Sequence, residues 1–396
     1  MNETKKKTSL FAYLCVLAIY LAANMNLIMN PAIPPLAEKV YTDSPYSTVM
    51  MIGTVLTFAM VPANLGVGAL IGRRLKYKST ALIGMILILV GGVGPFFVKS
   101  LSVVIFLRAV LGFGQGVLMP MQGALVQRLF PEDERASALG FGGVVMSASA
   151  VIYQLLSGWL AEGNPVNAYL IHGFIIVSIV IMLGLKEPEP LAYSAETTRA
   201  ASNEKIPARV YFCSFCFIFV WIFFYPALMN LTGVLTSENL GTASTGGLIS
   251  SLYTVGGIIG GAIIGKLAKV TGRFAVPIGL ASWVGGTGLL AYGRSVPVMI
   301  LGAVLCGIGL QTVWPGTSSN FLKFVPASRF AFSNSIFTTC MCIGCFLCSY
   351  FVSMVTNITG SADYRTPGIW GFWGFLIVGV VWSAMEILRP ADKLAK

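Results

Sequence analysis

Residues 69–78 read ALIGRRLKYK and end a long apolar run with a cluster of bases. The phrase returns at residues 262–269 as AIIGKLAK, again at the end of an apolar run. Each copy places aliphatic residues first, then a glycine, then lysine or arginine. A phrase written twice in a chain of 396 residues indicates an internal repeat whose unit is about half of the chain.

The apolar runs around these phrases are typical of a membrane protein. Hydrophobic residues make up 56% of the chain and charged residues 10%, with a mean hydropathy of +0.80. Soluble domains carry about 25% charged residues. Runs of about 20 residues cross a hydrocarbon core of about 30 Å at 1.5 Å per residue. Twelve such runs lie at 9–36, 48–72, 79–98, 101–127, 136–160, 166–185, 209–234, 244–268, 274–293, 296–322, 328–354 and 368–388.

These runs lack the two-residue alternation of membrane β-strands. The sequence therefore predicts an all-α integral membrane protein with twelve transmembrane helices. The first run follows Lys5, Lys6 and Lys7, as the apolar region of a signal peptide would, but it is about twice as long. We therefore expect it to be an uncleaved first span.

The net charge of +11 is distributed in a way that gives the chain an orientation. If the N-terminus is cytoplasmic, 21 of the 26 Lys and Arg residues fall in the termini and inner loops, and Arg108 falls within a span. This is the positive-inside rule, so we expect a multi-pass protein of the cytoplasmic membrane with both termini in the cytoplasm. No basic face with aromatic stacking partners on a soluble module is found, which excludes nucleic acid as a partner. The four outer bases are Lys39, Lys99, Arg294 and Arg365.

Two further echoes keep almost the same offset as the repeated phrase. LRAVLGFGQGVLMP at 107–120 matches LGAVLCGIGLQTVWP at 301–315, and Pro131 in LFPEDER matches Pro326 in FVPASR. Because these matches share one register, they predict two pseudo-symmetric six-helix bundles. Parallel repeats of this kind place a substrate site at the interface between the halves.

The two bundles are predicted to be separate units of the chain. Residues 186–208 contain too few apolar side chains to pack and are interpreted as a cytoplasmic linker. The N-terminal bundle is then residues 1–185 and the C-terminal bundle residues 209–396.

These features together resemble the major facilitator superfamily, over nearly the whole chain. The resemblance is carried by the basic loop after the second span, by Pro-Glu just past the sixth, and by Arg108 with Gly112, Gly114 and Gly116 in the fourth. NPAIPPLAE at 30–38 is similar to the Pro-x-x-Pro ending of the first span in the family's twelve-helix drug and metabolite exporters. The resemblance implies a transporter in which spans 1, 4, 7 and 10 line a central cavity.

The chain departs from the family's pattern at two places. The loop between spans 2 and 3 carries a degenerate motif, because Gly72 and Leu75 stand where the family has Asp and a second Gly. The fifth span, GFGGVVMSASAVIYQLLSG, lacks the Gly-Pro pair of drug–proton antiporters.

The basic inner loops are candidates for a gate. Their glycines would let neighbouring helices approach closely. Their bases would meet helix C-terminal carbonyls, or the acids Glu132, Asp133 and Glu134 after the fourth span, in a contact that breaks when the inner side opens. The alternative is that the bases only set topology and bind anionic lipid headgroups. The gating candidates are Gly72, Arg73, Lys76, Gly265, Lys269 and Arg273.

Charge inside the spans is scarce, and it should mark function because an ionised side chain at mid-membrane costs about 2.5–3.5 kcal/mol or more. Arg108 is the one base within a span and His172 is the one histidine. Each lies about seven residues from the outer end of its helix, so both lie about 10 Å below the outer boundary. We expect the two side chains to share a depth.

Arg108 is expected to receive an anionic group of the substrate, since a guanidinium pairs bidentately with carboxylate, phosphate or sulfate. The alternative is that it binds backbone carbonyls and holds a helix bend. Glu38, at the outer end of the first span, is a rival partner that would pair with Arg108 when the outer side closes and make the pair a proton-coupling element. His172 is a second coupling candidate.

Uncharged side chains complete the expected lining of the cavity. They fall on the four spans that the family resemblance assigns to it, and they would hydrogen-bond the solute or give it flat apolar walls. Asn and Gln also bridge membrane helices without touching a ligand. These residues are Asn26, Asn30, Gln115, Tyr225, Asn230, Gln311 and Trp314.

The sequence argues against metal or cofactor binding, against a primary pump and against a membrane enzyme. Cys342, Cys345 and Cys348 form a C-x-x-C-x-x-C pattern, but it lies in an apolar helix where cysteine behaves as a small hydrophobe, so no metal and no cofactor are expected. No phosphate-binding loop of a primary pump occurs. A membrane enzyme needs a nucleophile, a base and an orienting group, which one histidine without an intramembrane carboxylate hardly provides.

We therefore expect a secondary active transporter that moves a small organic solute, anionic or amphipathic, by alternating access. The alternative is a proton-coupled multidrug or metabolite efflux antiporter, and a remote one is a non-transporting membrane sensor. The expected partners are the solute, a coupling ion that we take to be a proton, and membrane lipids. We expect the chain to act as a monomer.

Overall fold

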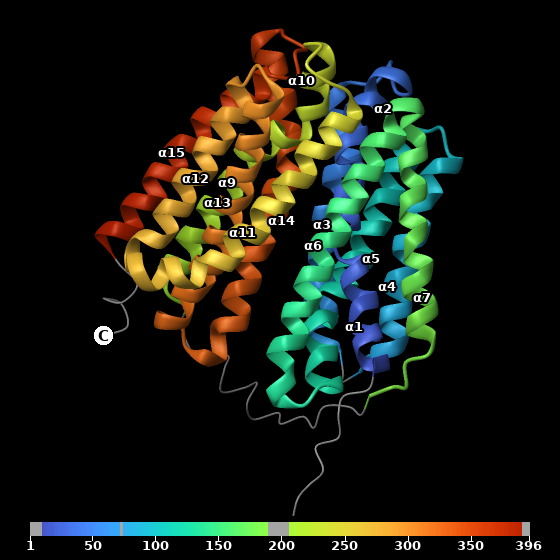
Figure 1. The fold of residues 1–396 in the computed structure, drawn as a ribbon, viewed down its shortest axis with the longest axis vertical. Coiled ribbons are helices and arrows are strands. Elements are labelled where there is room, and N and C mark those ends of the chain that lie inside the picture. Colours follow the sequence, from blue (N-terminus) through green and yellow to red (C-terminus); the bar gives the residue numbers. More distant parts are fainter. Residues whose placement is uncertain (1–9, 72–73, 189–205, 390–396) are drawn as a thin grey trace, which may run out of the picture.

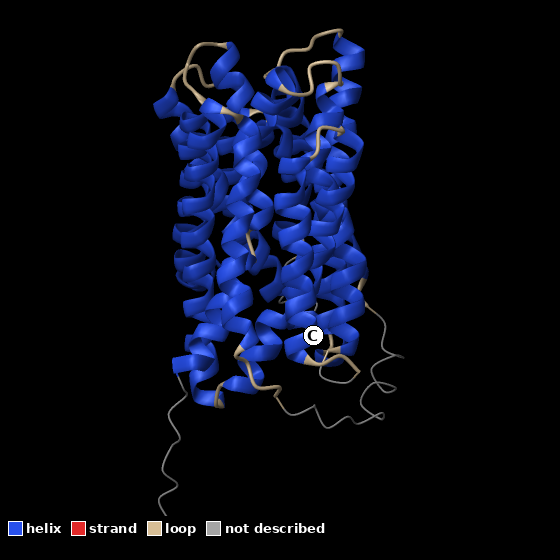
Figure 2. Ribbon diagram, turned by 90° about the vertical axis from the view of Figure 1, so that its right-hand side faces the viewer, coloured by secondary structure: helices blue, strands red, loops and turns tan. Residues whose placement is uncertain are grey.

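The computed structural model describes residues 10–71, 74–188 and 206–389, and in these ranges the regular elements are all helices (Figures 1 and 2). The N-terminal half consists of α1 (Leu10–Ala22), η1 (Met25–Ala32), α2 (Ile33–Lys39), α3 (Tyr46–Leu70), α4 (Tyr77–Val93), η2 (Gly94–Phe97), α5 (Leu101–Leu129), α6 (Glu132–Gly163), η3 (Pro165–Phe174) and α7 (Ile175–Leu183). The C-terminal half consists of α9 (Ala208–Met229), α10 (Leu231–Ser237), α11 (Ala243–Thr271), η4 (Gly272–Phe274), α12 (Ala275–Tyr292), α13 (Val296–Phe324), α14 (Ala327–Thr359) and α15 (Thr366–Leu388).

The described residues contain eleven helical stretches long and apolar enough to cross a membrane. One of them, Ala243–Tyr292, is 50 residues long and contains both α11 and α12. These two helices are separated at Gly272, whose φ of 53° is a conformation that glycine adopts without steric cost. The stretch therefore counts as two spans, and the prediction of twelve membrane helices is confirmed.

Two of the spans contain long 3-10 segments. The first span leaves the α-helix at Ala23 and continues as the eight-residue η1, in which Pro31 has no N–H to give to a helical hydrogen bond. The sixth span begins with the ten-residue η3. Runs of 3-10 helix beyond three or four residues are uncommon and often mark a functional hinge. The segments η1 and η3 pack against each other.

The two halves meet along α3 with α14 and along α6 with α11 (Figure 1). We call the side where α1 begins and α15 ends the inner side, following the predicted orientation, and the opposite side the outer side. Near the outer side, a Cβ at Gly158 of α6 would lie 2.6 Å from the carbonyl oxygen of Ala243 on α11. Closer to the middle, Thr54 Oγ1 lies 2.8 Å from Ser349 Oγ.

The inner parts of α6 and α11 differ from their outer parts. At Gly140, Gly143, Gly261 and Gly265, no atom of the described part of the chain lies within 4 Å of the place where a Cβ would stand. Large apolar side chains on these inner parts are exposed, namely Leu139, Phe141 and Val144 on α6 and Ile258, Ile259, Ile263 and Val270 on α11. The halves are therefore packed together on the outer side and lie apart along α6 and α11 on the inner side.

Candidate functional site

Arg108 of α5 is fully buried inside the N-terminal half. Its Nε donates to the carbonyl oxygen of Ile52 on α3 at 2.8 Å. One terminal nitrogen, Nη1, lies 3.0 Å from Nε2 of His172 on η3. The other, Nη2, has no hydrogen-bond partner within the described ranges. The prediction that Arg108 and His172 share a depth is thus confirmed, and the guanidinium retains a free donor.

The contacts of His172 fix the position of its proton. Nδ1 lies 3.0 Å from the carbonyl oxygen of Tyr169, which can only accept, so Nδ1 carries the hydrogen. A guanidinium can only donate, so Nε2 accepts from Arg108. His172 is therefore neutral in this arrangement. Gly92 of α4 makes room for it, because a Cβ there would lie 2.5 Å from the imidazole Cγ.

Two more buried polar side chains, Tyr169 and Tyr225, lie near this pair, and a third, Asn30, lies beside Tyr225. Asn30 on η1 leaves both amide atoms without a hydrogen-bond partner, and Tyr169 on η3 leaves its hydroxyl without one. Tyr225 on α9 lies beside Asn30 and within electrostatic reach of Arg108. Because α9 belongs to the C-terminal half, the group lies at the interface between the halves. We call Arg108, His172, Asn30, Tyr169 and Tyr225 the Arg108 cluster.

Gln115 of α5 holds the break in the first span rather than facing open space. Its side-chain nitrogen donates to the carbonyl oxygens of Ala22 and Ala23, at 3.3 and 3.1 Å. These carbonyls lose their helical donors where α1 ends. The same nitrogen lies 3.5 Å from Asn26 Oδ1, and Asn26 is partly exposed. Of these two predicted lining residues, Gln115 therefore stabilises the end of α1, and Asn26 remains a candidate for contact with the solute.

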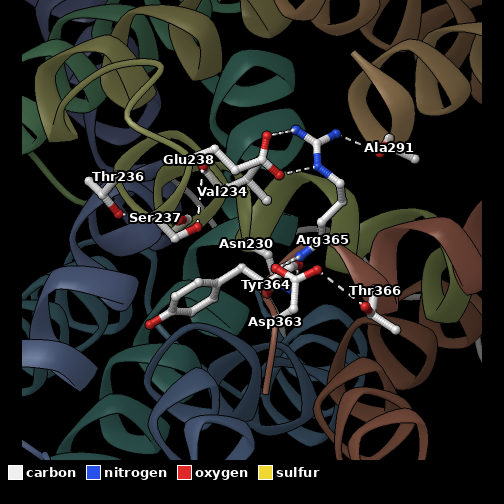
Figure 3. Close-up of polar contacts among 11 residues, drawn as sticks. Asn230, Val234, Thr236, Ser237, Glu238, Ala291, Asp363, Tyr364, Arg365 and Thr366 are labelled. Carbon is white, nitrogen blue, oxygen red and sulfur yellow. Dashed lines mark hydrogen bonds and ion pairs between the residues drawn. The ribbon is translucent and has the colours of Figure 1, made fainter. Parts of the chain in front are cut away.

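Asn230, another predicted lining residue, joins the halves on the outer side. Tyr46 of the N-terminal half donates to Asn230 Oδ1 at 3.0 Å, and Asn230 Nδ2 donates to the carbonyl oxygen of Tyr364 at 2.9 Å. The rings of Tyr46 and Tyr364 meet edge to face, 4.8 Å apart. Figure 3 shows Asn230 and Tyr364 beside the ion pair of Glu238 and Arg365.

Glu38 does not pair with Arg108, so the rival hypothesis is wrong for this outward-closed arrangement. Its side chain is exposed at the end of α2 and lies near Tyr364 of the other half. The path of η1 and α2 carries it to the outer surface, where it lines a cavity of about 550 Å³ with Lys39 and Glu162. Arg108 is left with neutral partners.

Glu238 is a residue that the sequence prediction missed. Arg365 donates to both of its carboxylate oxygens, at 2.5 and 2.7 Å, and also to the carbonyl oxygen of Ala291 (Figure 3). A signal was available, because NPAIPPLAE at 30–38 and NLTGVLTSE at 230–238 share the first Asn and the last Glu. Glu38 lies at the end of α2 and Glu238 directly follows α10, the corresponding short helices of the first and seventh spans, so we call the two residues counterparts.

The remaining predicted lining residues lie in the C-terminal half. Trp314 of α13 is partly buried, with its ring 6.3 Å from that of Phe217. Gln311 is also partly buried and packs beside Gly257 of α11, whose Cβ would lie 3.2 Å from Gln311 Cγ. Trp314, Phe217 and the buried Trp221 give the C-terminal half an aromatic interior.

The gating candidates have mixed outcomes. Gly72 and Arg73 lie outside the described residues. Gly265 allows no close helix approach here, because no atom of the described residues lies within 4 Å of the place where its Cβ would stand. Lys76 and Lys269 are exposed.

Arg273 does meet a helix C-terminal carbonyl, that of Ile387, at 3.5 Å. Glu187, which the sequence prediction did not name, is an acid that meets the basic loop after α3. Its two oxygens accept from the backbone N–H groups of Tyr77 and Lys78, at 2.5 and 3.0 Å. Glu187 therefore caps the N-terminus of α4 from the segment that follows the sixth span.

Comparison with known proteins places this geometry in a family. The family model described as Major Facilitator Superfamily matches residues 12–234 and 210–395. Among solved structures, a D-xylose–proton symporter has a TM-score of 0.78 at 12% identity, covering 97% of this chain and 98% of that one. The nucleoside transporter NupG has a TM-score of 0.77 at 12% identity, covering 95% and 100%.

Two curated relatives extend the comparison. The MFS-type transporter YttB of Bacillus subtilis is 22% identical over 69% of this chain and 70% of its own length. The multidrug efflux pump SdrM of Staphylococcus aureus is 27% identical over 37% of this chain, a match that spans 32% of the pump. Several relatives are matched over less than a third of their length, as SdrM is. Because the family model matches both halves, the chain belongs to the major facilitator superfamily and is a multi-pass membrane protein.

Proposed function

We propose that this protein is a secondary transporter, which moves a small organic solute across the cell membrane by alternating access. The observation that carries the proposal is the difference between the two sides of the molecule. The halves are joined near the outer side by Tyr46 with Asn230 and nearer the middle by Thr54 with Ser349. The inner parts of α6 and α11 lie apart. A carrier that rocks between two such arrangements opens a site at the interface to one side at a time.

A disulfide lock tests the proposal. The hydroxyl oxygens of Thr54 and Ser349 lie 2.8 Å apart, so Thr54→Cys with Ser349→Cys should form a disulfide that holds the outer side closed. A compound that raises the melting temperature in a ligand screen serves as the labelled solute, because a ligand that binds the folded state stabilises it. In proteoliposomes, oxidation should abolish exchange of this solute and a reductant should restore it.

Each single cysteine variant is the matched control, because eight native cysteines are present. Neither single variant should respond to oxidant. Exchange that continues unchanged in the oxidised double variant would rule out alternating access.

We propose further that the solute is an organic anion with an apolar part. No carboxylate among the described residues contacts Arg108, and an unneutralised buried charge costs several kcal/mol. An anion that meets the free Nη2 would remove much of this cost. The aromatic walls at Trp221, Tyr225 and Trp314 suit an apolar part of the same solute.

The alternative is a proton-coupled multidrug or metabolite efflux antiporter. It is supported by the partial match to SdrM and by Pro34 and Pro35 at the start of α2. A non-transporting sensor is the remote alternative. Exchange of the labelled solute in proteoliposomes (counterflow) would exclude it. An antiporter is distinguished by pH, because a proton that competes with the solute weakens its binding as the pH falls.

Three predictions from the sequence remain proposals. The excess of Lys and Arg in the inner loops supports cytoplasmic termini. A linker at residues 186–208 is supported by the end of α7 at Leu183 and the start of α9 at Ala208. A monomer is proposed because one chain supplies every member of the Arg108 cluster.

A further inference from the structure

We infer that His172 takes up a proton when an anion binds at Arg108, so that the solute and one proton cross the membrane together. This inference rests on the anion transport proposed above and adds the coupling ion, its binding atom and the sign of the coupling. It begins from the two hydrogen bonds that hold the imidazole.

In the structure both ring nitrogens of His172 are engaged. Nδ1–H donates to the carbonyl oxygen of Tyr169, and Nε2 accepts from Arg108 Nη1, each at 3.0 Å. A second proton on the ring would have to sit on Nε2 and would point at the guanidinium. Two cations would then face each other at hydrogen-bond distance, which is unfavourable in a buried site. Without an anion, His172 therefore stays neutral.

The groups that face the imidazole from neighbouring elements supply no negative charge. Arg108 faces it from α5, Gly92 from α4 and the backbone of Met25 from η1. Tyr41 faces Tyr169, and Tyr225 faces Arg108 from the C-terminal half. In the ranges that the structure describes, no carboxylate contacts either side chain. A counterion for a protonated His172 has to come from outside the protein.

Binding of an anion changes the hydrogen bonds of Arg108 and the protonation state of His172. When the anion binds the guanidinium bidentately, one oxygen accepts from the free Nη2, and the Nη1–H that faced His172 Nε2 turns to the other oxygen. The lone pair of Nε2 is then buried without a donor, which is unfavourable. A proton from water bonds to Nε2, and the new N–H donates to a second oxygen of the anion. The unpartnered hydroxyl of Tyr169 and the amide of Asn30 are further donors for the same anion.

The charge of the site is the same before and after loading. The empty site carries the one positive charge of Arg108. The loaded site carries Arg108, the protonated His172 and one negative charge on the anion, and its net charge is again +1. Transport of a monoanion with one proton is therefore electroneutral.

The two binding events must strengthen each other equally, since linkage is reciprocal. If the loaded site is protonated and the empty site is not, the affinity for the anion rises up to about tenfold for each unit that the pH falls. A proton-coupled efflux antiporter has the opposite sign, because there the proton and the solute compete. The sign of the pH dependence thus separates the two functions.

The single histidine makes a direct test possible. Protein labelled with ¹⁵N-histidine and purified on a tag without histidine gives imidazole signals from His172 alone. The probe is benzenesulfonate, a monoanion that does not titrate between pH 6 and 8, and benzenesulfonamide is its neutral control. We expect a neutral, Nδ1-protonated ring from pH 6 to 8 without the probe, and an imidazolium at pH 6 with saturating benzenesulfonate.

Affinity for benzenesulfonate, measured by calorimetry, should rise as the pH falls from 8 to 6. The inference is overturned by an imidazolium in the empty protein, by an affinity independent of pH, or by the same response to benzenesulfonamide. Absence of benzenesulfonate binding at every pH also overturns it.

Two variants assign the proton. In His172→Gln the amide oxygen can still accept from Arg108 but takes no proton, so binding should persist and its pH dependence should vanish. Glu386→Gln removes a buried carboxylate of the C-terminal half and keeps an acceptor for its partner Arg209. Its pH dependence should equal that of the parent, and a flat profile in this variant would move the proton to Glu386 and overturn the inference.

If His172→Gln does not fold, the spectra of the parent protein still decide the question. The disulfide lock described above tests alternating access without reference to His172. A working lock combined with a flat pH profile therefore removes only the proton coupling, whereas a failed lock removes the proposed function.

Discussion

Arg108 in the N-terminal half and Arg209 in the C-terminal half are both buried among helices, and the two arginines are neutralised differently. Arg209 on α9 pairs with Glu386 of α15 at 2.5 Å, donates to the carbonyl oxygen of Arg389, and lies over the ring of Phe324. Among the residues that the structure describes, Arg108 on α5 has only neutral partners, the carbonyl of Ile52 and the imidazole of His172. A charge that the protein neutralises can hold helices together permanently, whereas a charge left without a counterion is available to a ligand.

The positions of the two arginines also indicate that Arg209 is structural and that Arg108 is available to a ligand. Arg209 lies at the inner end of the C-terminal half, where α9 begins and α15 ends, and Asn320 of α13 also donates to Glu386 at 3.3 Å. This ion pair ties three helices of one half. The Arg108 cluster contains Tyr225 of the opposite half and so lies at the interface between the halves.

The largest effect is expected when Arg108 is replaced. Arg108→Ala removes the only charge that the site offers to an anion, and loss of one partner of a buried charge pair costs about 2–5 kcal/mol, or at least about 30-fold in affinity. Arg108→Lys should also weaken benzenesulfonate binding, because an ammonium does not pair bidentately. Calorimetry measures both.

The matched variant in the other half is Arg209→Lys, which should leave benzenesulfonate affinity within about twofold. If Arg108→Lys and Arg108→Ala bind the probe and move solute like the parent protein, Arg108 only holds a helix bend, and the comparison fails.

The next effect concerns the stability of the neutralised pair. Glu386→Leu alone leaves Arg209 buried without its counterion and should lower the free energy of unfolding by about 3–5 kcal/mol. Adding Arg209→Met removes the unpaired charge and should recover most of the loss. Thermal melts in detergent compare the single and double variants. A double variant no more stable than the single one would show that Arg209 is held by its backbone and ring contacts instead.

The counterparts Glu38 and Glu238 extend the comparison to the outer side. The hydrogen bond from Arg365 lowers the pKa of Glu238. This ion pair therefore stabilises the fold above the usual pKa of a glutamate, and its contribution is lost as the pH falls through the lowered pKa. Because the Glu238 carboxylate is partly exposed and a glutamine oxygen can still accept from Arg365, Glu238→Gln should cost at most about 1 kcal/mol, seen as a smaller difference between melts at pH 7 and pH 3.

Glu38→Gln is the control for this prediction, since Glu38 is exposed. It should leave both the melting temperature and proton-coupled transport close to those of the parent. Uncoupling of transport from a proton gradient in Glu38→Gln would restore Glu38 as the coupling residue in place of His172.

The smallest effect is expected at the inner loops. Replacing Lys76 and Lys269 together with Ala should slow transport by about twofold while membrane insertion is unchanged, because many other inner bases remain to set the topology. Unchanged transport in this double variant would leave these lysines with a role in topology alone. Initial rates of counterflow, normalised to the amount of inserted protein, give the comparison.

Parts of the candidate site could be predicted and parts could not. The common depth of Arg108 and His172 followed from counting residues along two helices at 1.5 Å per residue, and their contact at 3.0 Å confirms it. The role of Asn230 could not be predicted in this way. Its partner Tyr46 lies in the other half, and the contact depends on how the two halves close. Glu187 was missed because its partners are backbone N–H groups of α4, which leave no charge pattern in the sequence.

The sequence by itself determined the membrane, the twelve spans and the two related halves. Each of these depends on the length and order of apolar runs, which are local properties of the chain. Only the tertiary structure decided that Arg108 meets His172 rather than Glu38, that η1 and η3 are 3-10 helices, and that the halves are closed on the outer side. The physical reason is that contacts between helices depend on their rotation, tilt and kinks, which arise from packing against neighbours distant in sequence.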